Sequence, residues 1–190
     1  MIDTLTLEDN NGQVFRMSDY GLLLKSFDAP EPLPKTYMQE IDGADGSLDM
    51  TDTWWRYLVD FCHGKRIKLT NSADPDYYYE GRCAASHETR KRVTDVSLEL
   101  SCQPYRLSHR ETVITAQVNG TASILLEAAR KPVTPTITVS AEMTAEFDGY
   151  PMTLPAGSTF ASLYVVTDTA KPLMLTGNGQ VEIRWRDGVL

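Results

Sequence analysis

Three short segments decide the fold of this chain: His63-Gly64-Lys65-Arg66, Asp74-Pro75-Asp76-Tyr77-Tyr78-Tyr79-Glu80-Gly81-Arg82 and Cys102-Gln103-Pro104-Tyr105. The first follows an amphipathic stretch that predicts a helix over about 53–63, and Gly64 is placed to end that helix in a left-handed conformation. Residues 67–69 then alternate like a half-buried strand, 71–76 carry turn residues, and 77–79 have strong strand propensity. The block predicts a helix, a strand, a tight turn and a strand, with a last strand at 96–102.

The segments before this block also favour β-structure. Residues 4–7 and 14–17 flank Asn11-Gly12 and predict an opening hairpin. The proline-rich stretch at 29–34 cannot supply donors to a strand ladder, so we expect an extended arm or edge there. Strand character resumes at 35–41. The loop at 42–51 carries alternating carboxylates that could suggest calcium. Its glycines are not placed as in an EF-hand and no glutamate stands at the terminal ligand position, which favours a structural loop.

Turn signals punctuate the whole chain. Asn or Asp precedes Gly seven times, at 11–12, 42–43, 45–46, 119–120, 148–149, 178–179 and 187–188. Such pairs accept the positive φ angles of tight hairpin turns. Asn119-Gly120 is the predicted domain boundary, giving domains 1–118 and 119–190. The second part shows short strands at 123–128, 136–140, 145–148, 151–154, 161–166, 171–176 and 181–185, which predicts a compact β-sandwich.

Composition describes an ordinary soluble globular protein. The chain has 190 residues, 42% of them hydrophobic and 23% charged, with a net charge of −8. No apolar run is long enough to span a bilayer, and the N-terminus has no secretory signal, so we expect synthesis and assembly in a cytoplasm without membrane insertion. Both parts of the chain are acidic, which argues against binding a nucleic-acid backbone. Arg90-Lys91-Arg92 could touch phosphate, but a solvated turn between two strands is favoured.

No group of residues has the spacing of a catalytic, cofactor or metal site, so we expect no enzyme activity. Cys62, Cys83 and Cys102 form no Cys-x-x-Cys pair and read as buried thiols, with a Cys83–Cys102 disulfide left open. The three histidines lie in separate segments, and His63 is expected to act as a cation near the last carbonyls of the helix. Asp74 and Asp76 are neighbours in one turn, which does not place them across a cleft as glycosidase chemistry requires.

These motifs, in their order, resemble one family: the distal tail proteins of long-tailed, non-contractile bacteriophages. The resemblance rests on the three segments quoted above, on Asp45-Gly46-Ser47-Leu48-Asp49 after a strand, and on the ending Gly177-Asn178-Gly179-Gln180-Val181-Glu182-Ile183 with Arg186-Asp187-Gly188-Val189-Leu190. The structural motif residues are therefore Asp45, Gly46, Leu48, Asp49, His63, Gly64, Lys65, Arg66, Asp74, Pro75, Asp76, Tyr77, Tyr78, Tyr79, Glu80, Gly81, Arg82, Cys102, Pro104, Tyr105 and Gly179. The chain departs from the family by passing almost directly from 49–51 into the helix, where relatives have at least one more strand.

The resemblance implies a mostly-β protein with a ring-forming N-terminal β-domain that carries one short helix, followed by a small galectin-like β-sandwich. It implies a homohexameric ring at the virion's tail tip, joining the tail tube protein to the tip protein that leads DNA into the cell and anchoring receptor-binding proteins in many relatives. DNA would pass through the ring without specific binding. The candidate ring contacts are Pro30, Pro32, Leu33, Pro34, Asp42, Asp45 and Asp49.

A carbohydrate-binding module is the alternative reading of the second domain. Sugar binding needs an exposed aromatic platform with convergent polar groups, and Trp185 is the single tryptophan after residue 119. It shares a strand face with Val181 and Ile183, which favours a place in the core. Galectins read sugars with a His-Asn-Arg-Trp set, and residues 119–190 contain no histidine. In the first domain, Trp54-Trp55 would make a sugar platform if exposed. The apolar residues at helical spacing in the predicted helix favour packing of at least one of them in the core.

Overall fold

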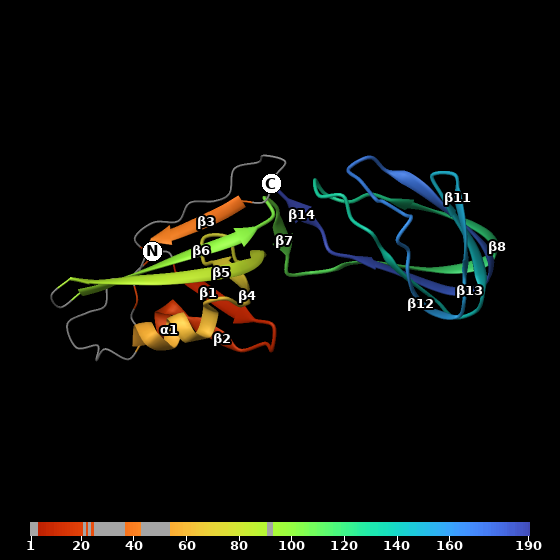
Figure 1. Ribbon diagram of the computed structural model, residues 1–190. Helices are drawn as coiled ribbons and strands as arrows, with labels where there is room; N and C mark the ends of the chain where they lie inside the picture. The colour runs from red at the N-terminus through yellow and green to blue at the C-terminus, as the bar shows by residue number, and fades with distance from the viewer. Residues whose placement is uncertain (1–3, 21, 23, 25–36, 43–53, 91–92) are drawn as a thin grey trace. The chain divides into compact units, whose positions relative to one another are not determined.

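The computed structural model describes residues 4–20, 22, 24, 37–42, 54–90 and 93–190 (Figure 1). The chain divides into two compact units, Met1–Leu107 and Ser108–Leu190. Antiparallel strands build both units, and the described residues contain one α-helix and one short 3₁₀ helix. The predicted mostly-β class with a single short α-helix is confirmed. No helix within the described ranges is long and apolar enough to cross a membrane.

The N-terminal unit is a strand ladder in the order β2-β1-β4-β5-β6-β3, with β7 also beside β5. Its elements are β1 (Leu5–Asp9), β2 (Val14–Arg16), η1 (Met17–Tyr20), β3 (Tyr37–Asp42), α1 (Trp54–Cys62), β4 (Arg66–Asn71), β5 (Tyr77–Arg90), β6 (Val93–Cys102) and β7 (Arg106–Ser108). The opening hairpin turns at Gly12, whose φ of 74° only glycine adopts freely. The predicted hairpin, the strand after the proline-rich stretch and the order helix, strand, turn, strand, strand are all confirmed.

Helix α1 packs its apolar face against β1 and β5 (Figure 1). Leu58, Phe61 and Cys62 fall on one face at helical spacing, and all three are buried. Phe15 stacks on the Tyr20 ring at 4.6 Å between centroids and lies 5.9 Å from Phe61, which joins the opening hairpin to the helix. The helix therefore closes a core that the strands alone would leave exposed.

The C-terminal unit is organised around one long ladder. Its strands are β8 (Thr112–Leu126), β9 (Thr136–Val139), β10 (Met143–Phe147), β11 (Tyr150–Leu154), β12 (Gly157–Phe160), β13 (Lys171–Trp185) and β14 (Gly188–Val189). β8 pairs with β13 along its whole length, from Thr112↔Trp185 to Leu126↔Lys171. On its other side β13 pairs first with β10 and then with β9. The two long strands curve around one end of the unit, so that one ladder serves both layers of the predicted sandwich (Figure 1).

Several predicted turns and strands of this unit are wrong. Asn119-Gly120 and Asn178-Gly179 make no hairpins; they lie within β8 and β13, facing each other in register. The expected strands at 171–176 and 181–185 are one continuous strand, and 161–166 contributes only an isolated bridge through Val166. The predicted domain boundary at 119 therefore falls inside a strand, whereas the chain divides between Leu107 and Ser108. Asp148-Gly149 does make the expected tight turn, with positive φ at both residues, between β10 and β11.

Candidate functional site

The His63–Arg66 motif fastens the end of α1 to strand β5. Gly64 has a φ of 74°, as predicted, and its N–H donates to the Cys83 carbonyl at 2.7 Å. The Cys83 N–H donates in turn to the Lys65 carbonyl at 2.8 Å. This reciprocal pair holds the chain that leaves the helix against a strand far along the sequence. The motif is architectural, because its backbone groups and the side chains of His63 and Arg66 all bond within the unit.

The prediction for His63 is wrong. Its Nδ1 atom lies 3.0 Å from the Ala85 N–H and 3.0 Å from the Ala85 carbonyl, so the ring bonds to the backbone of β5 and not to the last carbonyls of the helix. The helix end is satisfied by its own chain, with the His63 N–H donating to the Val59 carbonyl at 2.8 Å. His63 therefore adds a third fastening between α1 and β5.

The Asp74–Arg82 motif begins as a turn and continues as the first part of β5. The Asp74 N–H donates to the Asn71 carbonyl, and the Asp74 carboxylate pairs with Arg106, whose guanidinium lies over the Tyr77 ring at 5.5 Å. Pro75 and Asp76 are exposed at the tip of this turn. Two distant segments of the chain are thereby joined, because Arg106 contacts both a carboxylate and an aromatic face.

Consecutive residues of β5 face opposite sides of the ladder. Tyr79 points into the hydrophobic core, and burial raises the pKa of its phenol. Tyr78 faces the other side and is still only 5% exposed, with the Lys68 ammonium 5.7 Å from its ring centroid. Two of the three consecutive tyrosines are thus buried, on different faces of one strand. The tyrosine run is a packing motif.

Gly81 is the residue of this motif that nothing else can replace. It lies opposite Cys102 in the β5–β6 register, so the second and third motifs meet across the ladder. A Cβ atom at Gly81 would stand 2.2 Å from the Ser101 carbonyl oxygen and 2.8 Å from the Cys102 Cβ. The close approach of the two strands therefore requires glycine. Pro104 and Tyr105 follow as half-buried residues in the segment that leads to β7.

All three cysteines are free and buried. The Cys62 thiol lies 3.0 Å from the Leu58 carbonyl, to which it donates. A hydrogen bond with Cys62 and burial raise the pKa of Cys83, and burial raises the pKa of Cys102 to about 11. Cys83 lies opposite Leu100, and Cys102 opposite Gly81, so the two residues are not a directly facing pair. The open alternative of a Cys83–Cys102 disulfide is not present, and the thiols act as small core residues.

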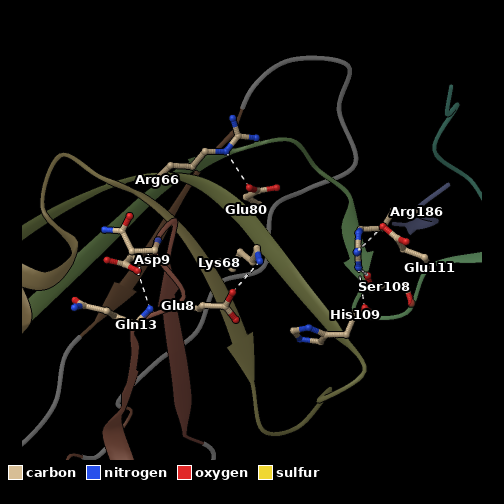
Figure 2. A network of polar contacts seen from close by, with 11 residues as sticks. Glu8, Asp9, Gln13, Arg66, Lys68, Glu80, Ser108, His109, Glu111 and Arg186 are labelled. Carbon is tan, nitrogen blue, oxygen red and sulfur yellow. Dashed lines mark hydrogen bonds and ion pairs between the residues drawn. The ribbon is translucent and has the colours of Figure 1, made fainter. Parts of the chain in front are cut away.

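A row of alternating charges crosses the outer side of the ladder. Glu8 faces Lys68 on the neighbouring strand, and Lys68 faces Glu80 on the next one. The Lys68 ammonium lies 2.8 Å from the Glu8 carboxylate, and Arg66 lies 3.0 Å from the Glu80 carboxylate. Figure 2 shows both ion pairs. The hydrogen bond to Glu8 raises the pKa of Lys68. The sequence reasoning missed this row, although the period-two spacing of Arg66 and Lys68 is its visible signal.

The last motif of the chain, residues 177–190, contributes glycines at a bend of β13 and a set of hydrogen bonds after the end of that strand. Gly179 has a φ of 146°, and a Cβ there would lie 2.5 Å from the Ser140 hydroxyl. The Asp187 carboxylate accepts hydrogen bonds from the Ala129 N–H, the Trp185 indole N–H and the Thr112 hydroxyl. Arg186 donates to the Ser108 and His109 carbonyls and pairs with Glu111 (Figure 2). The sequence predicts a turn at Asp187-Gly188 and gives no sign that the Asp187 carboxylate accepts three hydrogen bonds.

The tryptophan that a sugar site would use is not exposed. Trp185 is 5% exposed, belongs to the core of its unit, and its indole N–H is taken by Asp187. This agrees with its predicted place on the core face with Val181 and Ile183. The side chains of Trp54 and Trp55 lie outside the described residues. Within the described ranges, no group of three or more histidine, cysteine, aspartate or glutamate residues could hold a metal ion.

Most of the candidate ring contacts fall where the structure gives no description. The residues outside the described ranges are Pro30, Pro32, Leu33, Pro34, Asp45, Gly46, Leu48 and Asp49. Asp42 ends strand β3, and its backbone pairs with Ser97 of β6. The segment between 43 and 53, in which the family's additional strand would lie, is also outside those ranges. The structure brings together the three quoted segments, while the arm and the loop stay predictions.

The comparison with solved structures finds a likeness that extends over both units. The crystal structure of the SPP1 Dit protein, described as a paradigm of the hub adsorption apparatus in phages that infect Gram-positive bacteria, superposes with a TM-score of 0.64. The match covers 98% of this chain and 99% of that chain, at 17% sequence identity. This chain has the fold of a phage Dit protein. The resemblance to distal tail proteins is thus confirmed for the fold, although no protein-family model and no curated protein matches the sequence significantly.

Proposed function

We propose that this chain is a structural component of a bacteriophage tail tip: a hub between the tail tube and the proteins that meet the host. The observation that carries the proposal is the shared fold with the SPP1 Dit protein over 98% of this chain, which includes both units. The N-terminal motifs support it, because Gly64, Tyr79 and Gly81 serve backbone bonding or packing, as a structural role requires. The protein would be built into the virion after synthesis in the host cytoplasm.

The N-terminal unit would form a homohexameric ring. A closed ring needs heterologous interfaces in which one patch of a subunit meets a different patch of the next. The proline-rich stretch at 30–34 and the loop at 42–49 are our candidates for one of these patches. The C-terminal unit, a galectin-like sandwich on this proposal, would project outward, where it could hold receptor-binding proteins. The tail tube protein and the tip protein would contact the two faces of the ring.

The acidic balance of the chain fits a channel for DNA. The net charge is −8, and a wall of this sign repels phosphate. DNA could then pass the ring without the salt-sensitive binding that a basic surface produces. The protein would neither read nor hold the nucleic acid.

The test is the molar mass of the purified chain by light scattering, with negative-stain imaging of any large species. The proposal predicts a mass about six times that of the chain and open rings in the images, since a hexamer is the state it requires. A chain that stays monomeric at its highest soluble concentration and does not bind purified tail tubes would contradict it.

A charge-reversal pair localises the ring contact. Asp45→Lys with Asp49→Lys should dissociate the ring, because both carboxylates lie in the proposed contact. Glu142→Lys with Asp168→Lys is the matched control: it makes the same change of net charge at exposed sites of the C-terminal unit. Rings that survive the first pair as well as the control would exclude the loop at 42–49 as a contact.

A further inference from the structure

The free edge of β8 differs from the other strand edges of its unit. In the described residues, β11 and β12 end the strand order, and β8 pairs with β13 alone. β11 carries Pro151, which has no N–H to donate, and β12 is four residues long. Short edges and edge prolines are the means by which proteins prevent unwanted strand pairing. β8 has neither: it runs for 15 residues, Thr112–Leu126, without a proline or a charged side chain.

The lack of charged side chains on β8 contrasts with the acidic character of the whole chain. The chain as a whole carries −8, so the net charges of two copies repel each other, whereas β8 adds no charge to that repulsion. Val113 is 45% exposed and Leu125 is 66% exposed, one near each end of the strand. A neutral edge with exposed apolar residues at both ends is suited to pair with another strand.

The strand is also complementary to itself. When β8 is placed antiparallel to a second β8 with Asn119 opposite Asn119, residues of the same character face each other at five of the other seven pairs of positions. The two exceptions are Thr112 opposite Leu126 and Val118 opposite Gly120. On the inner face Ile114 meets Ile124 and Ala116 meets Ala122. On the outer face the pairs are Val113 with Leu125, Thr115 with Ser123, and Gln117 with Thr121. Apolar pairs and hydroxyl pairs directly opposite one another are the favourable cross-strand combinations.

The bend of β8 fits this register. The strand bends at Gly120, whose φ is 85°, next to the residue that faces itself. A two-fold axis through this point exchanges the two arms of the strand, so a bent strand meets a partner with the same bend. We propose that the free edge of β8 binds the β8 edge of a second copy of this chain, antiparallel, about a two-fold axis at Asn119. This isologous contact is separate from the heterologous contacts of a ring.

Disulfide trapping of the full-length chain tests the register. Directly opposed residues of antiparallel strands have Cα atoms about 4.5–5.5 Å apart, within the range of a disulfide. Asn119→Cys should therefore give a covalent dimer on mild oxidation. The native cysteines are buried and free, so the unaltered chain provides the background.

Gln117→Cys is the matched control on the same exposed face. In the proposed register its two copies stand four residues apart, roughly 13 Å, which no disulfide spans. Gln117→Cys alone should stay uncross-linked, whereas an equimolar mixture with Thr121→Cys should cross-link, because these two positions face each other. Failure of Asn119→Cys to cross-link, or equal cross-linking by Gln117→Cys alone, overturns the proposal.

A charge exchange measures the contact without a covalent bond. Thr115→Lys with Ser123→Lys places like charges opposite each other twice, and Thr115→Lys with Ser123→Glu places opposite charges there. The dimer dissociation constant, from sedimentation velocity, should be roughly tenfold weaker for the first variant than for the second. Equal constants, or no dimer of the unaltered chain at any concentration, would show that β8 does not pair with itself. The proposed ring contacts lie at 30–34 and 42–49, outside β8. A loss of rings in the Asp45 and Asp49 variant therefore leaves the comparison of the two β8 variants unaffected.

Discussion

Glycine is required for different physical reasons in the two units. In the N-terminal unit Gly81 lies between β5 and β6 with a backbone that any residue could adopt, and it is required because Ser101 and Cys102 approach so closely. In the C-terminal unit Gly177 and Gly120 face each other with φ values of 152° and 85°, where a continuous ladder bends. Gly81 is required by lack of space and Gly120 by backbone conformation, whereas Gly177 is required by backbone conformation together with the nearby Met143 side chain. We therefore expect that no side chain is tolerated at Gly81. At Gly120 and Gly177 we expect smaller losses in the free energy of unfolding that differ between the two positions.

The largest effect is expected for Gly81→Ala. The added Cβ would lie 2.2 Å from a backbone oxygen that cannot move unless β5 and β6 separate. We expect the N-terminal unit to lose about 3 kcal/mol or more of its free energy of unfolding. Hydrogen exchange read separately for the two units measures this, because a local loss accelerates exchange in β5 and β6 while β13 is unchanged.

Gly12→Ala is the control for Gly81→Ala. It has a φ of 74° and open space around its Cβ position, so it suffers backbone strain without a clash. Its cost should be about 1 kcal/mol. Similar costs for the two substitutions would mean that β5 and β6 can separate without loss, which would contradict the packing role given to the motif.

The bend of the C-terminal unit gives the second prediction. Gly177→Ala strains the backbone and brings a Cβ to 2.8 Å from the Met143 Cγ, whereas Gly120→Ala meets nothing within 4 Å. Because the Met143 side chain can shift, we expect a loss of about 2 kcal/mol at Gly177 and about 1 kcal/mol at Gly120. Chemical denaturation of both variants measures the difference. A larger loss at Gly120 would place the main strain of the bend on β8 and not on β13.

These two regions also show what the sequence can reveal. The motifs of the N-terminal unit combine a helical period, a cap and alternating strands, and each of these signals is local, so the order of elements was predicted from residues alone. Asn119-Gly120 and Asn178-Gly179 carry the same local signal as Asp148-Gly149, yet only the last pair turns. Turn dipeptides also permit a bend within a ladder, and the partner strand decides between the two outcomes. Asp187 likewise gains two of its three donors, the Ala129 N–H and the Thr112 hydroxyl, from segments distant in sequence.

Buried thiols make the N-terminal unit sensitive to alkaline pH. Burial raises the pKa of Cys102 from 9.0 to about 11, so the folded state favours the neutral thiol. The stabilisation is complete below the pKa of the unfolded thiol and is lost as the pH rises from about 9 through 11. By linkage this amounts to about 2 kcal/mol at pH 11. Cys102→Ala should remove this part of the pH dependence, measured as the difference between the two proteins in denaturation midpoints from pH 7 to 11.

The Cys102→Ala comparison has its own internal check. Below pH 8 the difference between the two proteins should not vary with pH, because the thiol is neutral in both states. Any slope that remains above pH 9 in the variant is assigned to the other groups whose pKa values are raised, namely Cys83, Tyr79, Lys68 and Tyr164. A variant with the full slope of the unaltered chain would exclude Cys102 as a contributor.

The smallest effect is expected at Arg106, where the turn of the Asp74 motif is held by an ion pair. The two side chains are 35% and 36% exposed, so solvent screens much of their attraction. Arg106→Lys keeps the charge but loses the planar group that lies over Tyr77, and we expect a loss of about 0.5–1 kcal/mol. High salt should weaken the unaltered protein and the lysine variant alike, because both keep the ion pair. A difference between them that disappears in high salt would instead assign the contribution of Arg106 to charge and not to stacking.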